Sequence, residues 1–131
     1  PGPGNALGQV KFLFPNEYSI YFHDTPSKDK FKKDQRAFSH GCIRLSEPVK
    51  LAEYLLREDS TWTPKKIKEA MTGKTETIVR LKKPRPVILG YFTAWVDAHG
   101  HANFRRDVYG HDAKLAAELF ALGAGEEVAV K

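Results

Sequence analysis

The sequence predicts a mainly β domain with short α-helices, and three observations support this class. Apolar and polar residues alternate along residues 9–14 and 18–23, a period of two that is typical of strands with one buried face. Strand-like runs return within residues 77–108, between turn residues. Apolar residues at helical spacing occur only in short stretches, near residues 47–56, 64–72 and 113–122.

Length and composition favour a single domain. With 131 residues, of which 41% are hydrophobic, the chain can bury one core but not comfortably two. We therefore assign residues 1–122 to one domain and expect residues 123–131 to form a flexible tail. No apolar run approaches the roughly 20 residues that a membrane-spanning helix needs.

The first expected element is a β-hairpin made of residues 9–14 and 18–23, with Pro15-Asn16-Glu17 as the break between its strands. Alternation in the second strand turns one set of side chains toward a core and the other set away from it. The core set is Tyr18, Ile20 and Phe22, and the opposite set is Ser19, Tyr21 and His23. Residues 28–37 are too charged and aperiodic for a strand, so we expect a loop there.

Two short helices follow. The Ser46 hydroxyl can cap a helix that contains Glu47 and Pro48 in its first turn and ends near Leu56. A second helix starts at Thr63-Pro64 and ends near Gly73, with three apolar side chains facing inward: Ile67, Ala70 and Met71.

The last third of the chain returns to strand patterns. Asp97-Ala98-His99-Gly100-His101 is a turn between two of the strands, and Asp112 can cap a final helix over residues 113–122. The expected strands cover residues 77–81, 87–96 and 102–108.

Cys42 is the only cysteine of the chain and lies in Phe38-Ser39-His40-Gly41-Cys42-Ile43-Arg44-Leu45. A thiol next to a glycine suits a nucleophile, because glycine allows a close backbone approach to a substrate and a turn that a side chain would block. The alternative is a buried cysteine that acts as a small hydrophobic residue. A lone cysteine excludes a disulfide within the chain.

His23 is the candidate base for this thiol. It lies at the end of the predicted strand, beside the turn Asp24-Thr25-Pro26-Ser27, where a rigid element can hold an imidazole at the lip of a cleft. A histidine at a strand end can also be a plain surface residue. His40 is a weaker candidate base, because its near-adjacency to Cys42 in a tight turn makes the geometry harder to reach.

Metal and nucleic-acid chemistry are not expected. His99, His101 and His111 could be offered as metal ligands, but without a second cysteine or a helical histidine pair they are better interpreted as turn residues. We expect no metal and no cofactor. The net charge of +5 suggests an anionic partner, either nucleic acid or a cell-wall polymer. The basic residues are spread out and interrupted by acids, with no motif of a nucleic-acid-binding domain, so a solvated basic face and no nucleic-acid partner are favoured.

His23, fifteen intervening residues and then Ser39-His40-Gly41-Cys42 with apolar Ile43 resemble the signature of the L,D-transpeptidase (YkuD-type) catalytic domain. The resemblance extends from residue 1 to about Asp112 and is strongest to the long, multi-domain proteobacterial members. Arg44 stands where most members have Asn, and Asp24 where many have Gly. The resemblance implies the family's β-sandwich, here lacking its N-terminal strands, with residues 1–122 as the C-terminal part of the catalytic domain.

The resemblance also implies a substrate and a compartment. Members act on peptidoglycan stem peptides: the cysteine thiolate attacks the L-to-D bond of a donor tetrapeptide stem and transfers the thioester to the amine of an acceptor stem, giving a 3-3 cross-link. Carbapenem-type inhibitors acylate the same cysteine. We therefore expect a periplasmic, cell-wall-facing enzyme whose export signal is not in this chain, and the upstream part of the same polypeptide as a partner.

Site roles follow from this chemistry. The oxyanion would be bound by the N–H groups of Gly41 and Cys42, with Tyr21 as a possible third donor. Either the carbonyl or the carboxylate of Asp24 would orient His23. Ser39 and His40 would shape the site. Arg44 would capture a substrate carboxylate, or alternatively pair with a local acid.

Two other functions remain open from the sequence. A cysteine L,D-carboxypeptidase, or hydrolase, would pass the acyl group to water, since cysteine and histidine alone do not choose the acceptor. A catalytically inactive wall-binding module is the other, and an intact cysteine and histidine pair argues against it. We also expect residues 1–131 to be an incomplete domain, which would leave the hairpin face of Val10, Phe12 and Phe14 exposed.

Overall fold

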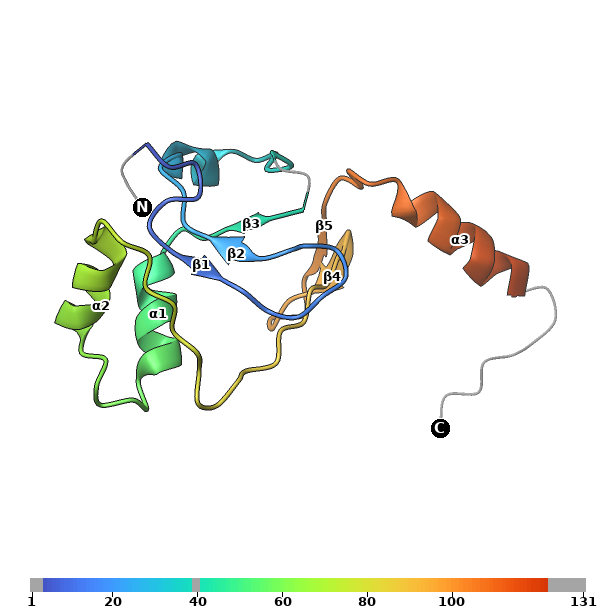
Figure 1. Cartoon of the computed structure of the whole chain (residues 1–131). Coiled ribbons are helices and arrows are strands. Elements are labelled where there is room, and N and C mark those ends of the chain that lie inside the picture. Colours follow the sequence, from blue (N-terminus) through green and yellow to red (C-terminus); the bar gives the residue numbers. More distant parts are fainter. Residues whose placement is uncertain (1–3, 39–40, 123–131) are drawn as a thin grey trace. The chain divides into compact units, whose positions relative to one another are not determined.

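The computed structural model describes residues 4–38 and 41–122 (Figure 1). It divides the chain into two compact units, Pro1–Val87 (unit 1) and Ile88–Lys131 (unit 2). Ser39, His40 and the predicted tail of residues 123–131 lie outside the described residues. The two units are taken in turn below.

A three-stranded sheet of very short strands organises unit 1. β1 (Lys11–Phe12), β2 (Phe22–His23) and β3 (Ile43–Arg44) are hydrogen-bonded in that order. β1 and β2 are antiparallel, with Phe12 opposite Phe22. β2 and β3 are parallel, with His23 opposite Arg44. The central strand therefore carries His23 next to the strand that directly follows Cys42.

The predicted hairpin is confirmed, but its strands are much shorter than the alternation suggested. Asn16 explains part of the difference, because its side-chain oxygen accepts hydrogen bonds from the N–H groups of Tyr18 (3.0 Å) and Ile20 (2.9 Å). Ser19 also has a positive φ of 54°, which ends the extended conformation on which alternation depends. Tyr18 is consequently exposed and His23 is buried, the reverse of the predicted faces.

The segment predicted as a loop contains a short 3-10 helix, η1 (Lys28–Lys32). The N–H of Lys30 donates to the carbonyl of Ser27 (3.3 Å), and the N–H of Lys33 donates to that of Lys30 (3.2 Å). Such a helix needs only a few residues and no apolar stripe, so hydrophobic periodicity could not reveal it. Its first residue, Lys28, contributes to the site described below.

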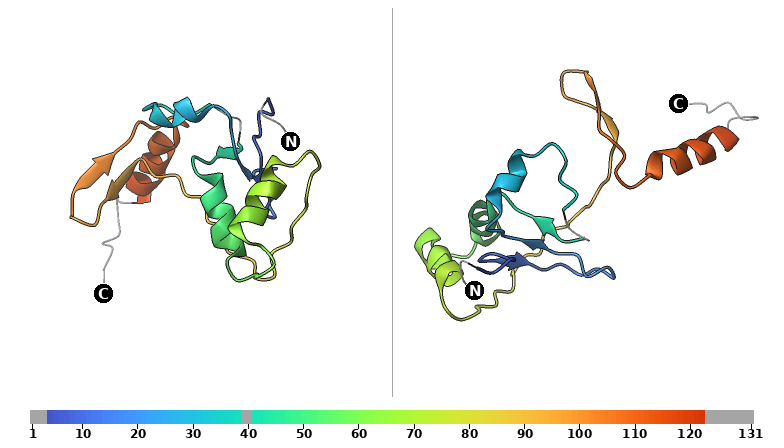
Figure 2. Two further views of the ribbon diagram at one scale, coloured as in Figure 1. Left: turned by 90° about the vertical axis from the view of Figure 1, so that its left-hand side faces the viewer. Right: turned by 90° about the horizontal axis from the view of Figure 1, so that it is seen from above.

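Two helices cover the apolar part of unit 1. α1 (Pro48–Leu56) and α2 (Pro64–Thr72) lie side by side in both views of Figure 2. The predicted cap of α2 is confirmed, since the Thr63 hydroxyl oxygen accepts from the N–H of Lys66 (3.3 Å). The predicted Ser46 cap of α1 is wrong, because Glu47 occupies the N-cap position and makes no side-chain capping bond.

The core of unit 1 is small. Ala52, Ile67 and Met71 are buried, whereas Ala70 is only half-buried. Partly buried side chains from the hairpin, from α1 and from the segment between the helices pack against this core: Val10, Phe12, Leu56 and Trp62. The same hairpin residues that line the core thus belong to the strand that pairs with His23.

Unit 2 contains an antiparallel pair, β4 (Ala94–Val96) and β5 (Ala102–Phe104), and the helix α3 (His111–Leu122). The predicted turn between the strands is present, since the N–H of Asp97 donates to the carbonyl of His101 (3.0 Å). Asp112 lies inside the first turn of α3 and is not its cap. The carboxylate of Asp107 accepts from the N–H of Asp112 (2.7 Å) instead.

The fold class is the main correction. Within the described residues the chain is a mixed α/β structure, mostly without regular structure, with one sheet of three strands and one of two, and no β-sandwich is formed. Residues 77–81 are not a strand, and only the end of 87–96 is one. The segment after residue 81 is held by ion pairs, Lys82 with Asp59 (3.0 Å) and Lys83 with Glu58 (2.9 Å), instead of by a neighbouring strand. Alternation describes side-chain type and cannot tell whether a partner strand exists.

Candidate active site

Parallel pairing of β2 and β3 brings the two halves of the predicted motif together. The N–H of Ile43 donates to the carbonyl of Tyr21 (3.0 Å), and the N–H of Leu45 donates to the carbonyl of His23 (2.9 Å). Because Ile43 lies opposite Phe22, the preceding residue, Cys42, lies beside Tyr21 in the register. The ladder thus fixes the strand of the candidate nucleophile against the strand of the candidate base.

His23 is buried, with 3% of its surface exposed, instead of lying at an open lip. Its ring nitrogen Nδ1 contacts the backbone carbonyl oxygen of Asp24. A carbonyl oxygen can only accept, so this contact favours the tautomer with hydrogen on Nδ1. Nε2 then carries the free lone pair, which is the form that can act as a base.

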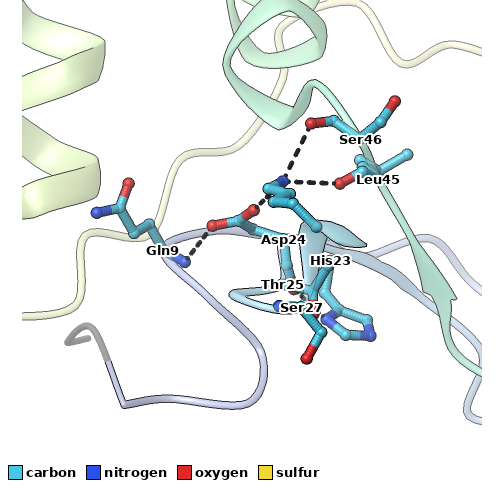
Figure 3. Close-up of polar contacts among 8 residues, drawn as sticks. Gln9, His23, Asp24, Thr25, Ser27, Leu45 and Ser46 are labelled. Carbon is cyan, nitrogen blue, oxygen red and sulfur yellow. Dashed lines mark hydrogen bonds and ion pairs between the residues drawn. The ribbon is translucent and has the colours of Figure 1, made fainter. Parts of the chain in front are cut away.

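The Asp24 carboxylate has other partners, which Figure 3 shows. Its Oδ1 accepts from Lys28 Nζ (2.7 Å), and its Oδ2 accepts from the N–H of Gln9 (3.0 Å). Burial alone would raise the pKa of Asp24, but the hydrogen bonds from Lys28, Gln9 and Thr25 and the charge of Lys28 outweigh burial and lower it. The contact of His23 with Asp24 is therefore made by the carbonyl, while the carboxylate is engaged by a cation and an amide.

Tyr21 is the side chain nearest in register to Cys42. A hydrogen bond with Cys42 is the main reason that the pKa of the Tyr21 hydroxyl is raised above its ordinary value. The Tyr21 ring also lies near the His23 imidazole, with 5.9 Å between the ring centroids. Cys42 itself is partly exposed and forms no disulfide. The Tyr21 phenol is thus a neighbour of both the Cys42 thiol and the His23 imidazole.

Gly41 and Arg44 flank this group. Among the described residues, a Cβ added at Gly41 would meet only Ile20 Cγ1, at an ordinary contact distance of 3.6 Å. Arg44 has a buried Nε that finds no acceptor in the described part of the chain. Ser39 and His40, predicted to shape the site, lie outside the described residues.

The sequence did not single out Lys28 or Thr25. Thr25 is 2% exposed, and its hydroxyl oxygen accepts from the N–H of Ser27 (3.2 Å). The spacing of Asp24 and Lys28, four residues apart, was the available signal. It was hidden because Lys28 opens a highly charged run that is typical of a solvated segment.

Residues 4–38 and 41–122 contain no group of three or more His, Cys, Asp or Glu side chains placed to hold a metal ion. His101 Nδ1 lies 3.5 Å from Asp97 Oδ2 within the β4–β5 turn. None of the helices described is long and apolar enough to cross a bilayer.

A buried histidine on β2 and a cysteine directly before the adjacent parallel strand β3 define the class of the site, a candidate cysteine nucleophile with its base. Comparison with known proteins identifies the family to which the chain belongs. The family model for the L,D-transpeptidase (YkuD) catalytic domain matches residues 1–80. The chain is also 36% identical over 111 residues to an inferred L,D-transpeptidase of Haemophilus influenzae; this match covers 85% of the chain and 22% of that protein.

The chain therefore belongs to the L,D-transpeptidase catalytic domain family, and the family assignment made from the motif is confirmed. It spans about a fifth of the length of the Haemophilus relative. The matched segment includes β1, β2 and β3 with His23 and Cys42.

Proposed function

We propose that this chain is part of a peptidoglycan L,D-transpeptidase in which Cys42 is the nucleophile and His23 the base. The observation that carries the proposal is the placement of His23 on the strand paired with β3, with Nδ1 against the Asp24 carbonyl and Nε2 left as the acceptor. Family membership supplies the substrate class. At neutral pH only a small fraction of an ordinary cysteine is the reactive thiolate, so a base is required to take the proton of the thiol.

The acylation half of the reaction balances with these two residues. His23 Nε2 takes the proton of the Cys42 thiol, and the thiolate attacks the carbonyl carbon of the third residue of a donor tetrapeptide stem. The bond to the nitrogen of the fourth residue then breaks, and His23 returns the proton to this departing amine. The product is a thioester on Cys42.

The transfer half reverses the roles. The side-chain amine of an acceptor stem attacks the thioester carbonyl, and His23 takes a proton from that amine. The carbon–sulfur bond then breaks, and His23 returns this proton to the departing sulfur of Cys42. The result is a bond between two third-position residues. Water in place of the amine would give hydrolysis, so the choice of acceptor depends on what reaches the thioester.

Each tetrahedral intermediate needs donors for its oxyanion. The N–H groups of Gly41 and Cys42 are the proposed pair, with the Tyr21 hydroxyl as a third. Tyr21 is supported in this role by its hydrogen bond with Cys42, which places a phenol next to the sulfur that forms the new bond. A donor there would strengthen as negative charge develops on the carbonyl oxygen.

Arg44 is proposed to hold a carboxylate of the stem peptide. Its Nε is buried and meets no acceptor among the described residues, and a buried guanidinium N–H without a partner is costly. A bidentate carboxylate would satisfy it. Ser39 and His40 complete the proposed wall of the site. A periplasmic location and inhibition by carbapenems follow from the same proposal.

The test is incubation of the protein with purified muropeptides, followed by mass spectrometry. We expect cross-linked dimers from the wild type, and none from Cys42→Ala. His23→Ala should lower turnover by about 10²- to 10⁴-fold, the range of general-base catalysis. His40→Ala tests the weaker candidate base and should lose less turnover than His23→Ala. Circular dichroism checks that each variant is folded.

Other results would overturn parts of this assignment. Tripeptides without dimers would replace transfer by hydrolysis. Near wild-type turnover in His23→Ala, with loss in His40→Ala, would make His40 the base. Failure of a carbapenem to add to Cys42 in the folded wild-type protein would favour an inactive wall-binding module.

A further inference from the structure

Lys28 has an unusual environment for a lysine in a charged surface segment. Its Nζ donates to Asp24 Oδ1 (2.7 Å), to the Leu45 carbonyl (3.0 Å) and to the Ser46 carbonyl (3.0 Å) (Figure 3). An ammonium group has three N–H donors, so protein acceptors use all of them. A solvated lysine would give these hydrogen bonds to water.

The partners of Lys28 belong to segments on both sides of the candidate site. Asp24 directly follows β2, which ends at His23, whereas Leu45 and Ser46 directly follow β3 and lead into α1. The N–H of Leu45 also donates to the His23 carbonyl. Lys28 therefore ties the chain after the histidine strand to the chain after the cysteine strand, at the end of the shared ladder.

The other oxygen of the Asp24 carboxylate is fixed as well. Oδ2 accepts from the N–H of Gln9, and the Asp24 N–H donates to the Val10 carbonyl (2.9 Å). Gly8 lies so close that an added Cβ would come within 2.3 Å of Oδ2. The side chain and the backbone of Asp24 are thus held from two directions, by Lys28 and by residues 8–10.

The fixed position of Asp24 matters for His23, because the backbone carbonyl of Asp24 accepts a hydrogen bond from the His23 ring. A peptide group can present its carbonyl to the ring only while residue 24 keeps its backbone conformation. We propose that Lys28, acting through the Asp24 carboxylate, is a positioning residue that holds this carbonyl against His23 and the β2 and β3 ends together. The proposal rests on the proposed role of His23 as the base.

A purely structural ion pair on the surface offers a comparison. Lys65 and Glu69 have the same spacing as Asp24 and Lys28, but lie 3.9 Å apart with side chains that are 87% and 64% exposed. The Lys28 and Asp24 side chains are 45% and 11% exposed. Exposed pairs of this spacing contribute little to stability. Lys65→Met is therefore the matched control for Lys28→Met, since each removes the lysine of one such pair.

The first measurement is catalytic. Lys28→Met should lower kcat by about 10- to 100-fold, the effect of a modest misplacement of a reacting group, with little change in KM. The pH midpoint for alkylation of Cys42 by iodoacetamide should move to higher pH. Lys65→Met should change neither. Asp24→Asn should resemble Lys28→Met, and the double variant should add little to either, because both act through one contact.

The second measurement reads the tautomer without activity. The ¹⁵N shifts of a neutral imidazole distinguish hydrogen on Nδ1 from hydrogen on Nε2, and the His23 signals are identified by their loss in His23→Ala. We expect the Nδ1–H form in the wild type and in Lys65→Met, and a mixture of both forms in Lys28→Met. Lys28→Gln, which keeps N–H donors for the two carbonyls, is the second variant if Lys28→Met does not fold, and should also give a mixture.

The outcomes separate the two proposals. If Lys28→Met, or Lys28→Gln in its place, keeps the wild-type kcat, pH midpoint and tautomer while His23→Ala is inactive, the positioning role is overturned and the base stands. If His23→Ala itself keeps wild-type turnover, the base assignment is overturned, whatever Lys28 does. A drop in melting temperature with an unchanged tautomer would make Lys28 a structural residue only.

Discussion

The two units of the chain differ in what is buried within them. Unit 1 contains a small apolar core around Ile67 and a buried polar group formed by His23, Asp24 and Thr25. In unit 2, no side chain among residues 88–121 is fully buried. Its polar contacts gather instead around two half-buried carboxylates, those of Asp97 and Asp107.

A hydrogen-bonded aspartate carboxylate should therefore contribute differently to the two units. Asp24 and Asp107 each accept several hydrogen bonds, and each has a lowered pKa. The donors to Asp24 include the Lys28 cation, and water has little access to replace them. The donors to Asp107 are neutral, namely the Tyr91 hydroxyl and nearby backbone N–H groups, and Asp107 itself is only half-buried. A given substitution should thus cost more in unit 1.

The largest expected difference is in apolar packing. Ile67 is 3% exposed, whereas Leu119 on α3 is 58% exposed. Ile67→Ala should lower the free energy of unfolding by about 2–5 kcal/mol, because a buried side chain is lost and a cavity remains. Leu119→Ala should change it by about 0.5 kcal/mol or less. Urea unfolding followed by circular dichroism measures both. Equal losses would show that the Leu119 side chain is covered in solution.

Sequence patterns predicted the elements that local chemistry defines. The α2 helix was predicted because Thr63 and Pro64 give its start without tertiary help, and the β4–β5 turn because Asp97 and Gly100 favour a turn. Strand lengths were not predictable in the same way. The Ser19 conformation and the Asn16 side chain end the hairpin ladder early, and the ion pairs of Lys82 and Lys83 replace a strand.

The candidate site shows a similar division. His23 and Cys42 were predicted as the site from the strand end, the lone cysteine and the family motif, and the parallel register brings their two strands side by side. The carbonyl contact of His23 and the three acceptors of Lys28 depend on backbone positions after both strands. No residue type encodes such positions, so the sequence left the carbonyl and the carboxylate of Asp24 as equal options and gave Lys28 no role.

Glycines give the next comparison, because Gly8 and Gly100 both have positive φ, of 62° and 83°. An alanine at Gly100 would meet no atom within 4 Å, so it suffers only the backbone strain of about 1–2 kcal/mol. An alanine at Gly8 has the same strain and also collides with Asp24 Oδ2 at 2.3 Å.

Gly8→Ala should therefore destabilise the protein more than Gly100→Ala and, unlike it, slow the alkylation of Cys42. Thermal unfolding and the iodoacetamide rate measure the two effects. Equal melting temperatures together with equal alkylation rates would mean that the Asp24 carboxylate moves aside without consequence, which would weaken the link between residues 8–10 and the site.

Low pH should reduce the stability of unit 1 through protonation of Asp24. Its pKa is lowered in the folded protein, so the unfolded chain binds the proton more readily. The stabilisation is then fully present above an unfolded pKa of about 4 and is lost as pH falls through the lowered folded value. Asp24→Asn should reduce the slope of unfolding free energy against pH below about pH 4.

The slope should not vanish in Asp24→Asn, because other carboxylates also have lowered pKa values. The hydrogen bonds from Thr61 and Lys82 lower the pKa of Asp59 to about 2. Asp59→Asn is thus a matched control that should also reduce the acid slope but leave Cys42 alkylation at pH 7 unchanged. An acid slope in Asp24→Asn equal to that of the wild type would mean that the Lys28 and Asp24 contact does not persist in solution.

The smallest effect is expected at Asp107, the counterpart of Asp24 in unit 2. Its carboxylate accepts from the N–H groups of Gly110 (2.9 Å) and Asp112 (2.7 Å), at the start of α3. Asp107→Asn keeps one acceptor oxygen but removes the negative charge, and a negative charge stabilises a helix N-terminus. Hydrogen exchange at these two amides should accelerate, while global unfolding and Cys42 alkylation stay close to wild type.

Glu118→Gln removes a charge from the same helix away from Asp107 and should leave both amides protected. If Asp107→Asn slowed Cys42 alkylation, the half-buried Asp107 carboxylate would influence the site as the buried Asp24 carboxylate is proposed to do, and the contrast between the two units would fail.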